Sequence, residues 1–129
     1  MTENRFFHFY LALSISFIFL FVFFILSSFG LIQSSEGARL IGEASRWCER
    51  VSDGLFREPL NTLSNLGFMI VGLYMFWVIC NDRQNSTNPF IGITTISLLY
   101  ASVVIYLGPG SMLMHGTNTE CEFGYFSIY

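Results

Sequence analysis

Three stretches of this chain run for many residues with no acidic or basic side chain other than histidine. They cover residues 6–31, 59–80 and 90–119. A run of about 20 apolar residues is long enough for a helix to cross the roughly 30 Å hydrocarbon core of a bilayer. We therefore predict an all-α fold, a polytopic transmembrane helix bundle. It would have about three spans, and a fourth would begin near the C-terminus.

The composition supports a membrane protein and excludes some other classes. Hydrophobic residues make up 53% of the 129 residues and charged residues only 12%, whereas soluble domains carry roughly a quarter charged residues. The six basic residues are all arginines and the net charge is −3, so no basic patch indicates nucleic acid. The three cysteines, at 48, 80 and 121, lack CxxC spacing, which indicates neither a zinc ribbon nor a disulfide framework.

The sequence divides into three parts. Residues 1–33 form an N-terminal transmembrane helix, because their apolar run exceeds the 7–15 residues of a secretory signal peptide, the rival interpretation. Residues 34–58 hold four arginines and five acids, which predicts a charged interfacial segment with a short amphipathic helix. Residues 59–129 form the remaining membrane part, with spans at about 59–80 and 90–116.

Three crossings determine which polar residues can meet. The charged segment 34–58, the start of the second span and His115 should lie on one side of the membrane. His8 should lie on the other side, about 30 Å away. More arginines flank the first side than the second, so the positive-inside rule places segment 34–58 on the cytoplasmic side.

The second span begins with a stripe of polar side chains. Glu58, Asn61 and Asn65 are spaced i, i+3 and i+7, and Ser64 adjoins them, so they share one helix face. Amides within lipid need hydrogen-bond partners, and the stripe therefore predicts hydrogen bonds between helices. Glu58 has a second interpretation, as a solvated carboxylate at the positive end of the helix dipole.

The third stretch contains a glycine–proline–glycine break, residues 108–110. It is either one helix kinked at Pro109 or two helices, the second of which starts at Ser111. Ser111 and His115 are four residues apart and would share a face, with Gly108 and Gly110 allowing close packing. His115 is either a structural hydrogen-bonding residue or a metal ligand. A local zinc site completed by Glu120, Cys121 or Glu122 is a further alternative.

Three motifs together carry a resemblance to a known family. WCE at 47–49, REPLNTLSN at 57–65 and GPGSMLMHGT at 108–117 occur in this order. With these motifs in this order, the chain resembles the alkaline ceramidase family. The members of that family are seven-helix membrane hydrolases, and their superfamily also contains the adiponectin-receptor-like proteins. The resemblance implies an intramembrane zinc amidase that cleaves the amide of ceramide with a zinc-activated water. It makes His115 one of three zinc ligands and Ser111 a catalytic residue that polarises the water or the oxyanion.

The resemblance also implies calcium and an incomplete zinc site. The Trp47 carbonyl, Glu49 and Glu58 would contribute to a calcium site. The two other zinc ligands of the family come from an HxxxH pair, which these 129 residues lack. We therefore expect the N-terminal portion of a ceramidase-like protein, inactive as this chain, with ceramide-like lipid and membrane lipid as its partners. The alternatives are a non-catalytic membrane remnant and a lipid-binding, receptor-like member of the same superfamily.

Overall fold

The computed structural model describes residues 5–32, 40–44, 47–83 and 87–117, and all four elements in this part of the chain are helices. These helices are α1 (Phe7–Ser28), α2 (Pro59–Ser64), α3 (Leu66–Asn81) and α4 (Thr95–Thr117). Helix α1, the combined helix of α2 and α3, and helix α4 are each long and apolar enough to cross a membrane. The prediction of an all-helical chain with three apolar spans is confirmed.

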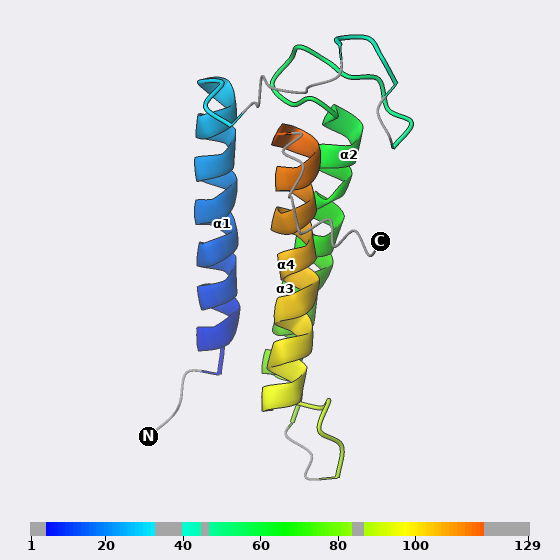
Figure 1. Ribbon diagram of the computed structural model, residues 1–129. Coiled ribbons are helices and arrows are strands. Elements are labelled where there is room, and N and C mark those ends of the chain that lie inside the picture. The colour runs from blue at the N-terminus through cyan, green and yellow to red at the C-terminus, as the bar shows by residue number, and fades with distance from the viewer. Residues whose placement is uncertain (1–4, 33–39, 45–46, 84–86, 118–129) are drawn as a thin grey trace, which may run out of the picture.

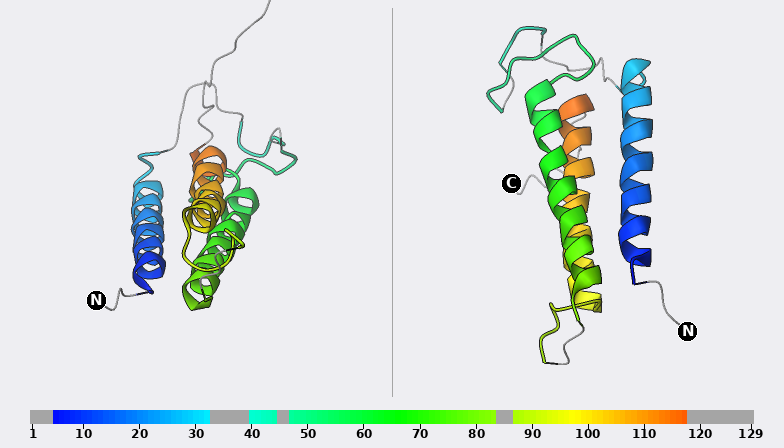
Figure 2. Two further views of the ribbon diagram at one scale, coloured as in Figure 1. Left: turned by 90° about the horizontal axis from the view of Figure 1, so that it is seen from below. Right: turned by 180° about the vertical axis from the view of Figure 1, so that it is seen from behind.

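The three spans lie side by side and alternate in direction (Figures 1 and 2). Helix α4 packs along α2 and α3, and α1 lies beside this pair. The end of α1, the start of α2 and the end of α4 meet at one end of the bundle, where residues 47–58 also lie (Figure 1). His8, near the start of α1, lies at the opposite end. His8 and His115 therefore lie at opposite ends of the bundle, and their positions on opposite sides of a membrane stay a prediction.

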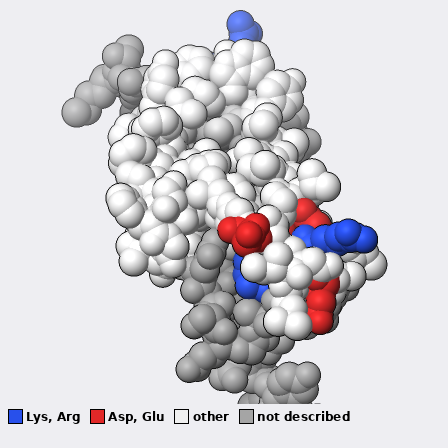
Figure 3. All heavy atoms as spheres, turned by 90° about the horizontal axis from the view of Figure 1, so that it is seen from above, with Lys and Arg blue, Asp and Glu red and all other residues white. Residues whose placement is uncertain are grey.

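The surface of the bundle matches a lipid environment. Large apolar side chains are exposed on all three spans, among them Phe17, Ile70 and Tyr106. A helix that is hydrophobic all round is typical of a membrane span. In the view along the bundle from the loop end, most of the charged side chains gather on the loop, and the helices around it are white (Figure 3).

The charged segment differs from its prediction. Its described parts, residues 40–44 and 47–58, form turns and a single bridge between Ala44 and Arg50 instead of an amphipathic helix. Gly42 and Cys48 have positive φ angles of 86° and 65°, a conformation that a right-handed helix does not contain. The predicted short helix is therefore wrong for these residues, because the chain reverses direction there.

The second span has a local break at Asn65. The side-chain amide of Asn65 donates to the carbonyl of Asn61 at 2.5 Å, and the hydroxyl of Ser64 donates to the same carbonyl at 3.0 Å. Side chains that bond to a helix carbonyl in this way compete with the backbone ladder. Helix α2 therefore ends at Ser64, and α3 continues the span from Leu66.

The third span starts later than the apolar run predicts. The hydroxyl of Thr94 accepts from the backbone N–H of Ser97 at 3.1 Å, and the hydroxyl of Ser97 accepts from the N–H of Thr94 at 3.0 Å. This reciprocal pair works like a capping box, and it sets the start of α4 at Thr95 instead of residue 90. Helix α4 then continues through Pro109 to Thr117, which decides between the two alternatives in favour of one helix.

Glycines allow the helices to approach closely. A Cβ atom at Gly72 in α3 would lie 2.8 Å from the backbone nitrogen of Ile105 in α4. A Cβ at Gly108 would lie 3.0 Å from the carbonyl oxygen of Asn65, and one at Gly116 would lie 2.8 Å from the Phe23 ring. The predicted close packing is confirmed for Gly108. It is wrong for Gly110, where a Cβ would meet nothing within 4 Å.

Candidate functional site

A histidine and a glutamate meet at the loop end of the bundle. Nδ1 of His115, near the end of α4, lies 2.7 Å from Oε2 of Glu58, the residue that precedes α2. Glu58 is buried, with 3% of its side chain exposed, and His115 is 13% exposed. When the carboxylate of Glu58 is ionised it only accepts hydrogen bonds, and Nδ1–H of a neutral His115 then donates while Nε2 keeps a lone pair. No hydrogen bond within the described residues engages Nε2.

The polar stripe of the second span continues from this pair. The side-chain amide of Asn61 donates to Oε2 of Glu58 at 3.0 Å. The hydrogen bonds of Ser64 and Asn65 described above end on the Asn61 carbonyl, so they lie within the second span and do not join it to another helix. Glu58 is therefore the member of the stripe whose described side-chain hydrogen bonds cross to another span.

Glu49 caps the start of the second span. Its Oε1 accepts from the backbone N–H of Leu60 at 2.7 Å, and its Oε2 accepts from that of Asn61 at 2.8 Å. The first N–H groups of a helix have no partner within the helix, and Pro59 at the first position has no N–H to satisfy. A carboxylate from the loop thus satisfies the first two available donors and also complements the helix dipole.

Removal of this cap should loosen the start of the span. We expect Glu49→Ala to make the amides of Leu60 and Asn61 exchange with solvent about fivefold faster, since a helix cap contributes about 1 kcal/mol. Hydrogen exchange of the chain in micelles, followed by mass spectrometry, measures this rate. The exposed Glu43 in the same loop provides the matched control, Glu43→Ala, which should leave both amides unchanged. Equal exchange in the two variants would contradict the capping role.

Trp47 and the chain before α2 cover the histidine. The indole of Trp47 meets the imidazole of His115 edge-on, with the ring centroids 5.7 Å apart. The backbone N–H of Arg57 donates to the carbonyl of Gly116 at 3.4 Å. These contacts hold the loop over the end of α4, so His115 lies between an aromatic ring on one side and a carboxylate on another.

The arrangement fits one zinc ligand position. A metal-bound histidine commonly donates its other ring N–H to a carboxylate, and Glu58 stands in that place for His115. Ser111 is half-buried one helical turn before His115, and no described hydrogen bond joins it to the pair. Catalytic zinc sites use three protein ligands, and His115 alone supplies one.

The fit to calcium is poorer. Calcium takes six to eight oxygen ligands, whereas the oxygens of Glu49 accept from backbone N–H groups and Oε2 of Glu58 faces His115. Within the described ranges, no group of three or more His, Cys, Asp or Glu side chains is placed to hold a metal ion. The local zinc alternative with Glu120, Cys121 and Glu122 lies outside the described residues.

Sequence reasoning missed two features of this site. The distance of eleven residues between Glu49 and Leu60 gives no periodic signal, so the cap was not predictable from helix spacing. The contact between the Trp47 and His115 rings joins two of the three motifs, but only their order along the chain was visible beforehand. Comparisons with protein-family models, curated proteins and solved structures find no match to this chain.

Proposed function

We propose that this chain contributes the Glu58–His115 part of the metal site of a ceramidase-like, intramembrane zinc amidase. The observation that carries the proposal is the 2.7 Å contact between Nδ1 of His115 and the buried carboxylate of Glu58. It supports the proposal because it fixes the ring orientation and leaves Nε2 available, as a zinc-binding histidine requires. Beyond an all-helical bundle, the specific fold that this proposal implies is an incomplete seven-helix bundle of the ceramidase type.

Each residue of the site would have a separate role in this proposal. His115 would hold zinc through Nε2, and Glu58 would orient the ring and raise its basicity as a ligand. A bound zinc ion supplies Lewis acidity toward an amide carbonyl and toward water. Ser111, on the same face one turn earlier, would donate a hydrogen bond to the oxygen of the reacting amide. The contact with Trp47 would limit the access of water from the loop side.

The substrate in this proposal is a ceramide-like lipid. The site lies at one end of three apolar spans. The amide group of a ceramide-like lipid would lie at the same level, at the membrane interface, while the hydrocarbon chains of the lipid stay in the hydrocarbon core. In this proposal the positive-inside rule, applied to the arginines, would put segment 34–58 and the site on the cytoplasmic side. A calcium site is the weaker part of the proposal, because both carboxylate oxygens of Glu49 already accept hydrogen bonds from backbone N–H groups at the start of α2.

Zinc titration of the purified 129-residue chain tests this assignment. With one ligand in place of three, the chain should bind zinc weakly and should release no fatty acid from ceramide. His115→Ala should abolish even this weak binding. His8→Ala is the matched control, since His8 lies at the other end of the bundle, and it should bind zinc like the unchanged chain.

Other results would favour other functions. Zinc binding that is lost in His8→Ala or kept in His115→Ala would contradict the proposed ligand. Stoichiometric, chelator-resistant zinc in this chain would show that the site is complete without an HxxxH pair. Binding of a fluorescent ceramide with no zinc at all would favour the receptor-like alternative, and binding of neither would favour a non-catalytic membrane remnant.

A further inference from the structure

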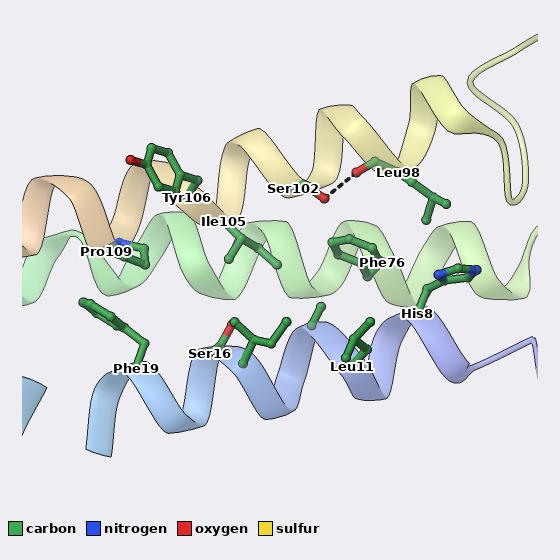
Figure 4. Close-up of a pocket in the computed structure, with 12 residues that line it drawn as sticks. His8, Leu11, Ser16, Phe19, Phe76, Leu98, Ser102, Ile105, Tyr106 and Pro109 are labelled. Atoms are coloured by element: carbon green, nitrogen blue, oxygen red, sulfur yellow. Dashed lines mark hydrogen bonds between the residues drawn. The ribbon is translucent and has the colours of Figure 1, made fainter. Parts of the chain in front are cut away.

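A hollow of the molecule lies away from the His115 site. It is a groove of about 500 Å³ between α1 and α4, with α3 behind it. Figure 4 shows Phe76 of α3 between the two outer helices, with His8 at one end of the groove and Phe19 and Pro109 at the other. The lining is almost entirely apolar.

Small side chains leave this volume open. Ala12 and Ser16 of α1 and Ser102 of α4 line the groove, and α1 meets α4 much less extensively than α3 does. Toward the loop end, Phe23 and Met112 are buried together with Phe56 and close the core between the groove and the site. The groove is therefore separate from the Glu58–His115 pair.

The groove has the depth of one leaflet. Eleven residues separate His8 from Phe19 along α1, which is about 16 Å at the helical rise of 1.5 Å per residue. One leaflet of the hydrocarbon core is about 15 Å thick. Since α1 begins at Phe7, the groove runs from the membrane edge that is remote from the loop to about the bilayer centre.

The lining and length of the groove favour a hydrocarbon chain. The lining is almost entirely apolar, and the groove is about as long as one leaflet is thick. A flexible acyl chain is apolar, has this length and is the molecule that surrounds a membrane span. Packing alone must then hold the chain, because lipid is as apolar as the groove lining.

The end of the bundle nearest His8 carries a net positive charge on its described side chains. Arg5 lies three residues before His8, and its guanidinium donates to the backbone carbonyl of Asp82, the residue that follows α3. The described charged side chains at this end are Arg5, Asp82 and Arg83, and their charges sum to +1. A guanidinium has five N–H donors, so Arg5 retains donors for a phosphate at the membrane surface.

From this depth, shape and charge, we infer that the groove binds one phospholipid of the leaflet remote from the loop. One acyl chain lies between α1 and α4, and the phosphate lies at Arg5. This binding site does not depend on the proposed hydrolase activity, because it lies on the other side of the Phe23–Met112 core.

Photo-crosslinking in vesicles tests the site. The full chain is reconstituted into phosphatidylglycerol vesicles that contain a small fraction of the same lipid with a diazirine in one acyl chain. After irradiation, mass spectrometry locates the labelled residues. We expect the groove side of α1, at Ala12 and Ser16, to carry roughly fivefold more label than the opposite side. This ratio corresponds to about 1 kcal/mol of preference of the lipid for the groove over the opposite side of α1.

The chain offers a matched pair of variants on the same helix. Ser16→Phe fills the groove and should lower the groove label roughly fivefold. Ser14→Phe adds the same ring two residues away, at an exposed position outside the groove, and should leave the label unchanged. If Ser16→Phe does not fold, Ser102→Phe fills the groove from an exposed position of α4.

Four results would overturn the inference or its phosphate contact. Equal labelling around α1 would mean that only bulk lipid contacts the helix. Groove label that persists in both filled variants would place the lipid elsewhere. Crosslinks from groove residues to a second copy of the chain would identify a protein occupant. A diacylglycerol with the same diazirine chain should label the groove several-fold less, and equal labelling would exclude the phosphate contact at Arg5.

Discussion

Replacement of Glu58 by alanine should lower the free energy of unfolding by about 3 kcal/mol, because loss of one partner leaves a buried polar group without compensation. The carboxylate of Glu58 is buried and accepts from both His115 and the side chain of Asn61. Its loss would therefore leave two donors in the protein without their acceptor. Reversible unfolding of the chain in mixed micelles with a denaturing detergent measures the change.

A double-mutant cycle separates the interaction free energy of Glu58 and His115 from the general loss of packing in each variant. The single variants Glu58→Ala and His115→Ala should each destabilise the chain, and the double variant should be at least about 1 kcal/mol more stable than their sum predicts. Glu58→Gln keeps an acceptor oxygen and should lose less stability than Glu58→Ala. Additive losses in the cycle would show that Glu58 and His115 do not stabilise each other.

The position of the pair was predictable from the sequence, although its contact was not. Three uncharged stretches predict three crossings, and the two crossings between Glu58 and His115 return the chain to the same membrane edge. Their 2.7 Å contact depends on how α2 and α4 pack, which the apolar pattern leaves open because residues facing lipid and residues facing a helix are equally apolar. The side of the membrane is a prediction from the arginines alone.

Local hydrogen bonds explain where the helix boundaries depart from the apolar pattern. Hydropathy does not distinguish a turn from a helix, so residues 90–94 looked like part of the span until the Thr94–Ser97 pair set the start of α4. The break at Asn65 likewise results from side chains that bond to the Asn61 carbonyl. Charge spacing predicted a helix in segment 34–58, but the turn conformations of Gly42 and Cys48 prevent one in its described part.

Replacement of Gly72 by leucine should have a comparably large effect on the bundle. A Cβ at this position would lie 2.8 Å from the backbone nitrogen and 3.1 Å from the Cα of Ile105. Backbone atoms cannot rotate away as a side chain can, so α3 and α4 would have to move apart along their contact. Overpacking of this kind costs about 1–3 kcal/mol, and we expect the upper end of that range because the lost contact is the main helix–helix contact of the fold.

The same helix contains its own control. Gly67 also lies in α3, and a Cβ there would meet nothing within 4 Å. Gly67→Leu should therefore keep the stability of the chain or raise it by up to about 1 kcal/mol, since glycine is a poor helix former. Unfolding of both variants in mixed micelles compares an identical substitution at a packed and at an open position. Equal stability of the two variants would mean that α3 and α4 do not pack at Gly72 in the membrane, because a leucine there is incompatible with the approach of the two backbones.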